Sequence, residues 1–349
     1  MLTSRPHKTT ACSFIPPYIT QEISQRGSPE QRAWALRTMV VTERLRGQRD
    51  VLGSLRISAP TGMKRRTIYD AEHGHELPGT LVRDEGDPSS KDPTVNEAYS
   101  GSGATYDFYW GAYHRNSVDN AGLRLDSTVH YGQNYDNAFW NGAQMVYGDG
   151  DGEIFNGFTK ALDVIGHELT HGVIDREARL TYRDEPGALN ESFSDVFGLL
   201  VKQYVANEAA ADSSWIIGEG LFTKSIHGTG IRSMKAPGTA YDDPVLGKDP
   251  QPSHVKDMYH GTDDNGGVHI NSGIPNHVFY MTAIEIGGFA WENAGKIWYV
   301  ALTDRLRSSA NFKDAAEVTL AVAGEIYGKG SREQKAVRGG WRKVGVLSS

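Results

Sequence analysis

The sequence has almost no cysteine and no long apolar stretch, and each absence excludes a class of protein. Cys12 is the single cysteine, so no disulfide can form within the chain. No apolar run approaches the length of about 18 residues that a membrane-spanning helix needs. An excess of basic residues is missing too. The 36 Lys and Arg against 43 Asp and Glu give a net charge of −7, which argues against general nucleic-acid binding.

The charge that is present divides the chain into two unequal parts. Residues 1–66 hold 12 Lys and Arg and 4 Asp and Glu, a net charge of +8, so the remainder carries −15. A basic segment ahead of an acidic body predicts either a tail for an outside partner or a segment that docks on its own body. The length of 349 residues corresponds to about two domains.

The apolar pattern predicts a β-rich half followed by a helical half. Residues 20–46 have a helical pattern with a break at Ser28-Pro29-Glu30, and residues 47–66 have the composition of an exposed linker. Residues 105–114 fit either a helix or a strand. Strands are indicated by the alternating segments 67–69, 80–83 and 127–131. Helical periodicity covers 160–178, 188–207, 273–287, 291–307, 311–327 and 331–345.

An H-E-x-x-H motif, His167-Glu168-Leu169-Thr170-His171, lies in the first of the helices predicted after residue 160. Two histidines four positions apart share one face of a helix, so both imidazoles can reach one metal ion. Glu168 lies about 100° around the helix, where it can take a proton from water that the metal activates. The alternative is a buried helix with two hydrogen-bonded structural histidines.

A second acidic motif downstream offers the third ligand that a catalytic zinc ion needs. Glu191 follows His171 by 20 residues and is the candidate ligand. Asp195 lies one helical turn further on the same face, where it can accept a hydrogen bond from the second nitrogen of a ligand histidine. The competing explanation for Glu191 is an acidic residue favoured by the helix dipole near an N-terminus.

In this order and spacing, the motifs resemble those of the thermolysin-like metallopeptidases. The resemblance covers most of the chain after Arg66 and includes residues 137–142, 145–152 and 263–273. It implies an α+β, two-lobed fold with the zinc-site helix at the cleft. The lobes it implies are a β-rich N-terminal lobe over 61–178 and a helical C-terminal lobe over 179–349.

The resemblance also implies roles for the matching residues. One zinc ion would be held by His167, His171 and Glu191. The implied catalytic residues are Glu168 as general base, His269 at the oxyanion with Asp264 orienting it, Tyr182 as second oxyanion donor and Arg232 on the substrate carbonyl. Asn137 and Ala138 would bind the substrate main chain. A pocket for a medium or large hydrophobic residue after the cleaved bond would be lined by Phe155, Phe158, Val164, Ile217 and Ile231, for which core packing is the alternative.

The sequence departs from the family where many relatives bind paired calcium ions. The corresponding positions here are Asp163, Lys202, Ser214, Ile216 and Glu219, so only two acids remain. We expect the Lys202 ammonium to replace one calcium as the partner of Asp163 or Glu219, and the paired calcium site to be lost. Whether other calcium sites remain is left open.

The N-terminal segment resembles the propeptide of the short-propeptide, protealysin-like group. Pro16-Pro17-Tyr18 matches the motif of that group, and residues 1–60 are therefore expected to be an inhibitory propeptide and linker, cut by autolysis within 47–66. A Pro-Pro-Tyr element could block the cleft because proline lacks the N–H that strand addition needs. A stiff turn in a tail is the alternative. Cys12 could bind zinc in the latent form or be a plain thiol.

Together these features predict a zinc-dependent neutral endopeptidase made as an autoprocessed zymogen. The alternative is a catalytically silent protein that binds peptides in the same cleft. The expected partners are protein or peptide substrates and the chain's own propeptide in cis, and a dedicated protein inhibitor is left open. The N-terminus lacks the apolar core of a secretory signal, which predicts synthesis in the cytoplasm and, if the enzyme is secreted, export by a non-standard route.

Overall fold

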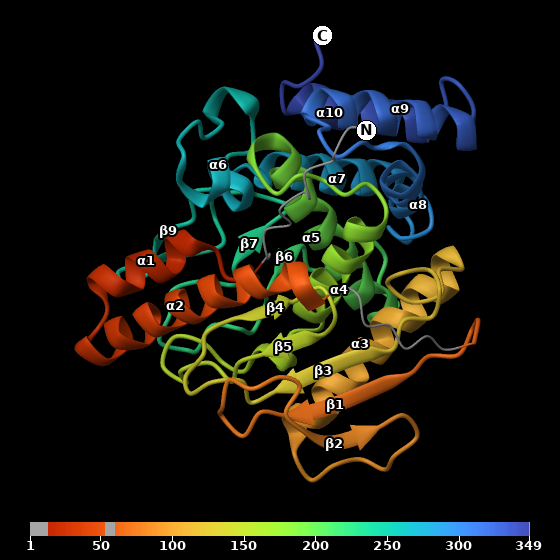
Figure 1. The fold of residues 1–349 in the computed structure, drawn as a ribbon. Coiled ribbons are helices and arrows are strands. Elements are labelled where there is room, and N and C mark those ends of the chain that lie inside the picture. Colours follow the sequence, from red (N-terminus) through yellow and green to blue (C-terminus); the bar gives the residue numbers. More distant parts are fainter. Residues whose placement is uncertain (1–12, 53–59, 349) are drawn as a thin grey trace, which may run out of the picture.

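Two lobes meet along the central helices α4 (Leu162–Arg176) and α5 (Asp184–Ala206), which pack against one another in the middle of the molecule (Figure 1). The computed structural model describes residues 13–52 and 60–348. A β-sheet lies on one side of the two helices and the C-terminal helices on the other, in the two-lobed arrangement that the sequence predicts. Within the described ranges, no helix combines the length and apolar character that crossing a membrane would require.

The N-terminal lobe is built on one five-stranded sheet of order β2-β1-β3-β5-β4. Its strands are β1 (Arg66–Asp70), β2 (Thr80–Asp84), β3 (Leu125–Val129), β4 (Ala138–Trp140) and β5 (Met145–Tyr147). The three central strands β1, β3 and β5 run parallel, whereas β2 and β4 are antiparallel edges. Helix α3 (Pro93–Tyr113) packs between this sheet and α4, and a short 3₁₀ turn (Phe158–Lys160) leads into α4.

The C-terminal lobe is helical, with short two-stranded ribbons and a 3₁₀ turn (Val255–Asp257) beside the cleft. Its helices are α6 (Asp263–Asn271), α7 (Gly273–Ile286), α8 (Ala294–Val300) with a π-helical continuation (Ala301–Arg305), α9 (Phe312–Tyr327) and α10 (Arg332–Lys343). The ribbons pair β6 (Ile216–Ile217) with β7 (Arg232–Ser233) and β8 (Asp242–Asp243) with β9 (Gly247–Lys248). These helices agree with the periodicity predicted after residue 160, except α6, which periodicity did not predict.

Two helices ahead of the sheet, α1 (Pro17–Arg26) and α2 (Pro29–Leu52), form a hairpin against one side of the molecule (Figure 1). The predicted break is confirmed: α1 ends at Arg26, and Ser28 Oγ accepts a hydrogen bond from Gln31 N at 3.2 Å as α2 begins. The expected linker over 47–66 is shorter than predicted, because α2 continues to Leu52.

The hydrophobic core joins the N-terminal segment to both lobes. Phe14, Ile15, Ile19 and Ile23 are buried and belong to the same apolar cluster as the sheet and α4. Burial of large apolar side chains contributes about 1.5–3 kcal/mol each, so these four residues stabilise the packing of the N-terminal segment on the lobes.

Candidate active site

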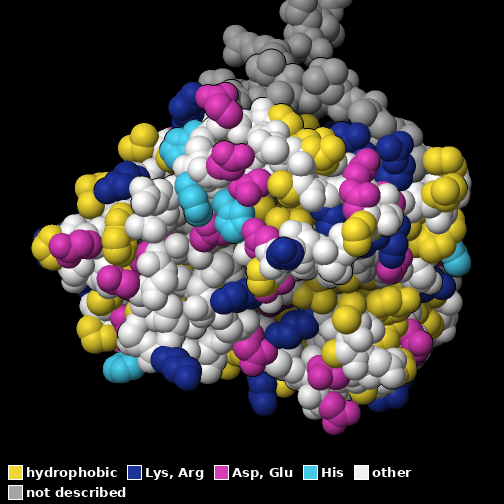
Figure 2. Space-filling model, turned by 90° about the horizontal axis from the view of Figure 1, so that it is seen from below, with side chains coloured by type: hydrophobic (Ala, Val, Ile, Leu, Met, Phe, Trp, Pro, Cys, Tyr) yellow, Lys and Arg dark blue, Asp and Glu magenta, His cyan; other side chains and the backbone are white. Residues whose placement is uncertain are grey.

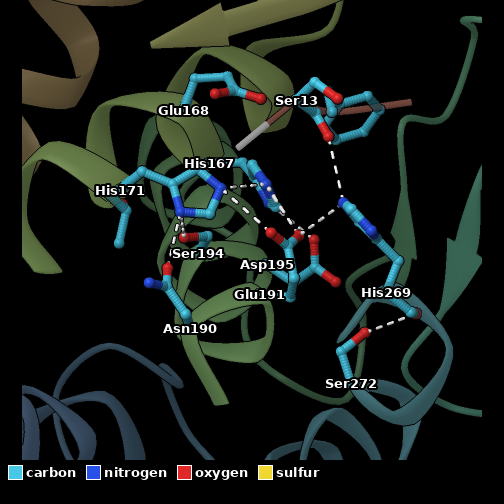
Figure 3. A network of polar contacts seen from close by, with 12 residues as sticks. Ser13, His167, Glu168, His171, Asn190, Glu191, Ser194, Asp195, His269 and Ser272 are labelled. Atoms are coloured by element: carbon cyan, nitrogen blue, oxygen red, sulfur yellow. Dashed lines mark hydrogen bonds and ion pairs between the residues drawn. The ribbon is translucent and has the colours of Figure 1, made fainter. Parts of the chain in front are cut away.

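Helices α4 and α5 bring the three predicted zinc ligands to one point. His167 and His171 are both buried, and their Nε2 atoms lie 3.0 Å apart (Figure 3). The Glu191 carboxylate, from α5, places Oε2 3.5 Å from His167 Nε2 and Oε1 3.5 Å from His171 Nε2. All three side chains therefore point their donor atoms at a common volume.

The outer nitrogens of the two histidines are fixed by neighbours on α5. His167 Nδ1 lies 2.8 Å from Asp195 Oδ1. His171 Nδ1 lies 2.8 Å from Asn190 Oδ1 and 3.0 Å from Ser194 Oγ. An Nδ1–H that donates outward leaves the Nε2 lone pairs facing inward, the arrangement of metal-ligating histidines.

The residues present fit a zinc ion. The two inward Nε2 atoms lie 3.0 Å apart, and neither carries a proton if both Nδ1 atoms donate, so no hydrogen bond can form between them. Glu191 Oε2 is buried without a hydrogen-bond partner among the described residues. Two imidazoles and a carboxylate are the donor set of many catalytic zinc sites. A bound cation would satisfy all three groups at once.

Asp195 is also the partner of the predicted substrate-binding arginine. Arg232 donates from Nε and Nη2 to the two Asp195 oxygens at 2.8 and 2.7 Å, and Asn276 Nδ2 adds a bond at 2.8 Å. Burial raises the pKa of Asp195, but Arg232 and His167 outweigh burial and hold that pKa well below its ordinary value. The carboxylate therefore stays ionised in a fully buried place.

Glu168 and the predicted oxyanion residues surround the same volume. Glu168 is buried, and its Oε2 accepts a hydrogen bond from Trp140 N at 2.9 Å. The Tyr182 hydroxyl donates to Glu191 Oε1 and lies 3.2 Å from His269 Nε2. The residues to which the sequence analysis assigns the base, the oxyanion donors and the metal ligands therefore lie around one volume.

His269 is oriented by an unusual turn in α6. Residues 264–267 all have left-handed backbone, with φ between 51° and 85°. The turn lets Asp264 accept hydrogen bonds from both His269 N, at 2.8 Å, and His269 Nδ1, at 2.6 Å. Burial lowers the pKa of His269, but the charges of Asp264 and Glu191 outweigh burial and raise it overall.

The N-terminal segment occupies the cleft through its main chain. Phe14 N donates to Ala138 O on the edge strand β4 at 3.1 Å, and Ile15 N donates to Asn137 Oδ1 at 2.9 Å. Arg232 Nη1 donates to Phe14 O at 3.4 Å. The Ser13 carbonyl oxygen lies 3.2 Å from His269 Nε2 (Figure 3).

The Phe14 ring fills a pocket beside the predicted zinc ligands. It lies edge-on to His167 with ring centroids 5.2 Å apart, and the Arg232 guanidinium lies 4.8 Å from its centroid. Its tip is next to Gly218, where an added Cβ would be 3.2 Å from Phe14 Cζ and 2.9 Å from Ile231. These contacts correct the prediction that Pro16-Pro17-Tyr18 itself blocks the cleft: Pro16 is the N-cap and Pro17 the first residue of α1, and residues 13–15 enter the site.

The predicted pocket residues are all buried, although they divide into two groups. Ile217, in β6, accepts a hydrogen bond at its carbonyl oxygen from Ile231 N, directly before β7, at 2.8 Å, and both lie beside Gly218 at the tip of the Phe14 ring. Phe155 packs on Phe158 and Phe222 with centroids 5.8 and 5.7 Å apart, which is the core packing named as the alternative. Val164, on α4, is fully buried. The sequence analysis does not identify Gly218 as a pocket residue. The one signal for it is its place between Ile217 and Glu219, directly after β6.

Lys202 lies at one of the positions that the resemblance assigns to paired calcium ions. Its Nζ lies 2.7 Å from Glu219 Oε2, so Glu219 rather than Asp163 is its hydrogen-bond partner. Asp163 accepts from Gly218 N at 2.7 Å. Burial raises the pKa of Asp163, and the nearby Lys202 charge opposes that rise.

Cys12 and part of the expected cleavage region, residues 53–59, lie outside the described residues.

Known proteins resemble this chain over nearly all of its length after residue 56. Family models described as the thermolysin metallopeptidase catalytic domain and its alpha-helical domain match residues 56–175 and 178–346. An extracellular metalloprotease of Pectobacterium carotovorum subsp. carotovorum is 50% identical over 99% of this chain and 98% of its own length. Protease PrtS of Photorhabdus sp. (strain Az29) is 48% identical over 95% and 91%. The structure of a protealysin precursor from Serratia proteamaculans is 51% identical, with a TM-score of 0.90 over 97% of this chain and all of that one.

Proposed function

Because this chain belongs to the thermolysin family of metallopeptidases, whose members hydrolyse internal peptide bonds, we propose that it is a zinc-dependent endopeptidase made as a zymogen. In this proposal the enzyme cleaves before hydrophobic residues and removes its own N-terminal segment. The observation that carries it is the seating of residues 13–15 across His167, Ala138 and His269 in the orientation of a substrate.

Residues 13–15 indicate how a substrate would bind. The N–H and carbonyl of Phe14 bond to Ala138 and Arg232, as the residue after a cleaved bond would. The carbonyl of Ser13, the equivalent of the carbonyl to be attacked, points to His269. Strand addition to β4 fixes the main chain without regard to sequence, so the side-chain pocket sets the preference.

The chemistry divides among the chain's own residues. A zinc ion held by His167, His171 and Glu191 would supply a Lewis acid for water and for the carbonyl. Glu168, held by Trp140 N, is placed to take the proton of the attacking water and pass it to the leaving amine. His269, with a raised pKa, and Tyr182 can donate to the oxygen on which negative charge develops.

The preference for hydrophobic residues after the cleaved bond rests on the Phe14 pocket. Phe14 is fully buried there, against Gly218 and Ile231 and beneath the Arg232 guanidinium. A side chain buried in this way contributes about 1.5–3 kcal/mol relative to an exposed one, which is enough to discriminate by tenfold or more.

The zymogen proposal assigns residues 1–60 to an inhibitory segment and linker, 61–178 to the N-terminal lobe and 179–349 to the C-terminal lobe. Direct occupation of the cleft by residues 13–15 supports latency, because no substrate can bind while Phe14 fills the pocket. We place the autolytic cut within 47–66, a range that runs from the last residues of α2 to the first residue of β1. By analogy with the relative named an extracellular metalloprotease, we propose that the enzyme is exported.

Replacing Glu168 by Ala tests the enzyme proposal. We expect kcat/KM on a Gly-Leu peptide to fall by about 100- to 10,000-fold, because general-base assistance is lost. Zinc content should not change, and the exposed Glu153→Ala variant should keep full activity. In the same samples, casein digestion with and without a zinc chelator separates an enzyme from a silent peptide-binding protein. N-terminal sequencing would show whether the precursor is cut within 47–66, and cutting that persists in Glu168→Ala would refute autolysis.

A further inference from the structure

Three side chains that could bind a metal meet at the carboxyl ends of the parallel strands. His73 lies in the turn after β1, His130 follows β3 directly, and Asp149 lies two residues after β5. These three strands are neighbours in the sheet, so the residues that follow them converge at one edge. Ligand sites recur at such edges in other folds with parallel strands.

The donor atoms of these residues are already close. His130 Nδ1 lies 2.9 Å from both oxygens of Asp149, and His73 Nδ1 lies 3.4 Å from Asp149 Oδ2. One donor atom from each of the three side chains lies within 4.8 Å of the other two. The two imidazoles meet edge to face with centroids 5.5 Å apart. On the face seen from below, Figure 2 shows histidine side chains gathered beside acidic ones.

The backbone holds both histidines in a conformation that costs energy. His73 has φ 60° and His130 has φ 53°, the left-handed region that costs an ordinary residue about 1–2 kcal/mol. Hydrogen bonds hold the two turns together, from His73 N to His130 O at 2.9 Å and from Gly132 N to Gly74 O at 2.9 Å. Strain of this kind persists where the surroundings fix it and is concentrated at functional sites and ligand clamps.

A second carboxylate orients His130. Its Nε2 lies 2.7 Å from Asp92 Oδ2, and Asp92 is itself fixed as the N-cap of α3 through Thr94 N at 2.8 Å. A carboxylate on one ring nitrogen directs the other nitrogen to a metal in many metal sites. Here that other nitrogen, Nδ1, faces Asp149 and His73.

We propose that His73, His130 and Asp149 form a second metal site, which binds a divalent transition-metal ion such as Zn²⁺. Two imidazole nitrogens and one carboxylate oxygen suit zinc, and water would complete the coordination. Asp92 occupies the Nε2 of His130, so Nδ1 is the nitrogen left to face Asp149 and His73. The metal therefore replaces the proton on Nδ1, while the Nε2–H stays bonded to Asp92.

Such an ion would link three loops of the N-terminal lobe. One of them, the turn with His73, faces α2 across a groove that Leu36 and Val40 also line. The loop with Asp149 leads towards Phe155, in the apolar cluster that includes Phe14. We therefore expect the ion to stabilise the lobe rather than to take part in peptide cleavage.

Zinc content of the full chain tests the site. The Glu168→Ala chain prevents autolysis and would be equilibrated with excess zinc, desalted and analysed by atomic emission. We expect two zinc ions per chain, and we expect the Tm to be higher than in a sample of the same chain that holds one zinc ion. In this background, His73→Asn should bind one zinc ion, because Asn tolerates the left-handed backbone but removes the imidazole.

His75→Asn is the matched control, since His75 is exposed in the same turn but stacks on Tyr131 outside the cluster. It should keep two zinc ions and the full zinc-dependent Tm gain. A single zinc ion in the parent chain would overturn the proposal. So would a second ion that survives in His73→Asn, because that ion would lie elsewhere.

Discussion

Asp195 joins two tasks that the sequence presents as separate. One of its oxygens bonds to His167 Nδ1, and both bond to Arg232. The orientation of a predicted zinc ligand and the position of the residue that contacts the Phe14 carbonyl therefore depend on the same carboxylate. A buried carboxylate with this many charged and polar partners is costly to disturb, because removing one partner leaves the others uncompensated.

Asp136, beside the main-chain-binding Asn137, is a buried acid that weakens the fold at neutral pH. It is 2% exposed, and its Oδ1 has no hydrogen-bond partner among the described residues. Burial and the charge of Asp151 raise its pKa well above the ordinary value. The folded state holds the Asp136 proton more tightly than the unfolded chain does. Its contribution to the free energy of unfolding is fully present below the unfolded pKa of about 4, and it is lost as pH rises through the folded pKa.

We therefore expect Asp136→Asn to stabilise the protein by about 1 kcal/mol or more near pH 8 and by less near pH 4. Thermal unfolding across that range, in the Glu168→Ala chain, measures the difference. The exposed Asp242→Asn serves as control and should show no such trend. An equal effect at both pH values would show that Asp136 ionisation is not the cause.

Lys202 should make stability independent of calcium. Burial raises the pKa of Glu219, but its hydrogen bond and attraction to Lys202 outweigh burial and lower that pKa. Lys202→Gln should cost about 1 kcal/mol, since the pair is partly exposed and Asp163 loses a nearby positive charge. Lys202→Glu, which restores an acid, should become calcium-dependent. Calorimetry with and without calcium checks both, with exposed Lys313→Gln as control. A large loss of Tm in the parent under a calcium-selective chelator would contradict the assignment.

At the scale of elements, periodicity predicted the long amphipathic helices and the strands with alternating side chains. It did not predict α3 as a whole, because this helix is buried on several sides and its Gly and Tyr residues hide the apolar stripe. It also missed α6, whose Asp-Asp-Asn-Gly-Gly start has the composition of a loop and is left-handed in the structure. The placement of His167 and His171 on one face of α4 follows from helical spacing alone, whereas the position of residues 13–15 in the cleft depends on tertiary contacts that no local pattern encodes.

The left-handed turn of α6 should be intolerant of side chains. An added Cβ at Gly267 would lie 2.6 Å from Tyr259 Cδ1, and its φ of 78° is itself unfavourable for Ala. We expect Gly267→Ala to displace Asp264 and His269 and to lower kcat by about 100-fold. Gly339→Ala is the control, because its Cβ would meet no atom within 4 Å in α10. Steady-state kinetics on folded protein measures kcat for both variants. An unchanged kcat in Gly267→Ala would show that the turn does not position His269.

For the whole molecule, latency should depend on one aromatic ring. Phe14→Ala removes a fully buried side chain, a change that typically costs about 3–5 kcal/mol, and so should speed loss of the precursor at least tenfold. Leu36→Ala is the matched control in the same segment, since Leu36 is 54% exposed. The time course of precursor loss on gels measures both. Equal rates for Phe14→Ala and the parent would mean that the hairpin α1–α2 alone maintains latency.

The direction in which residues 13–15 cross the cleft has an evolutionary consequence. Since Phe14 occupies the pocket that would receive a substrate side chain, the proposed precursor would carry a copy of its own recognition sequence. A mutation that reshapes the pocket around Gly218 or Ile231 would change the substrate preference and, at the same time, weaken the binding of residue 14. We expect lineages that acquire a new cleavage preference to change position 14 in step, so that the N-terminal segment of each relative records what its mature enzyme prefers to cut.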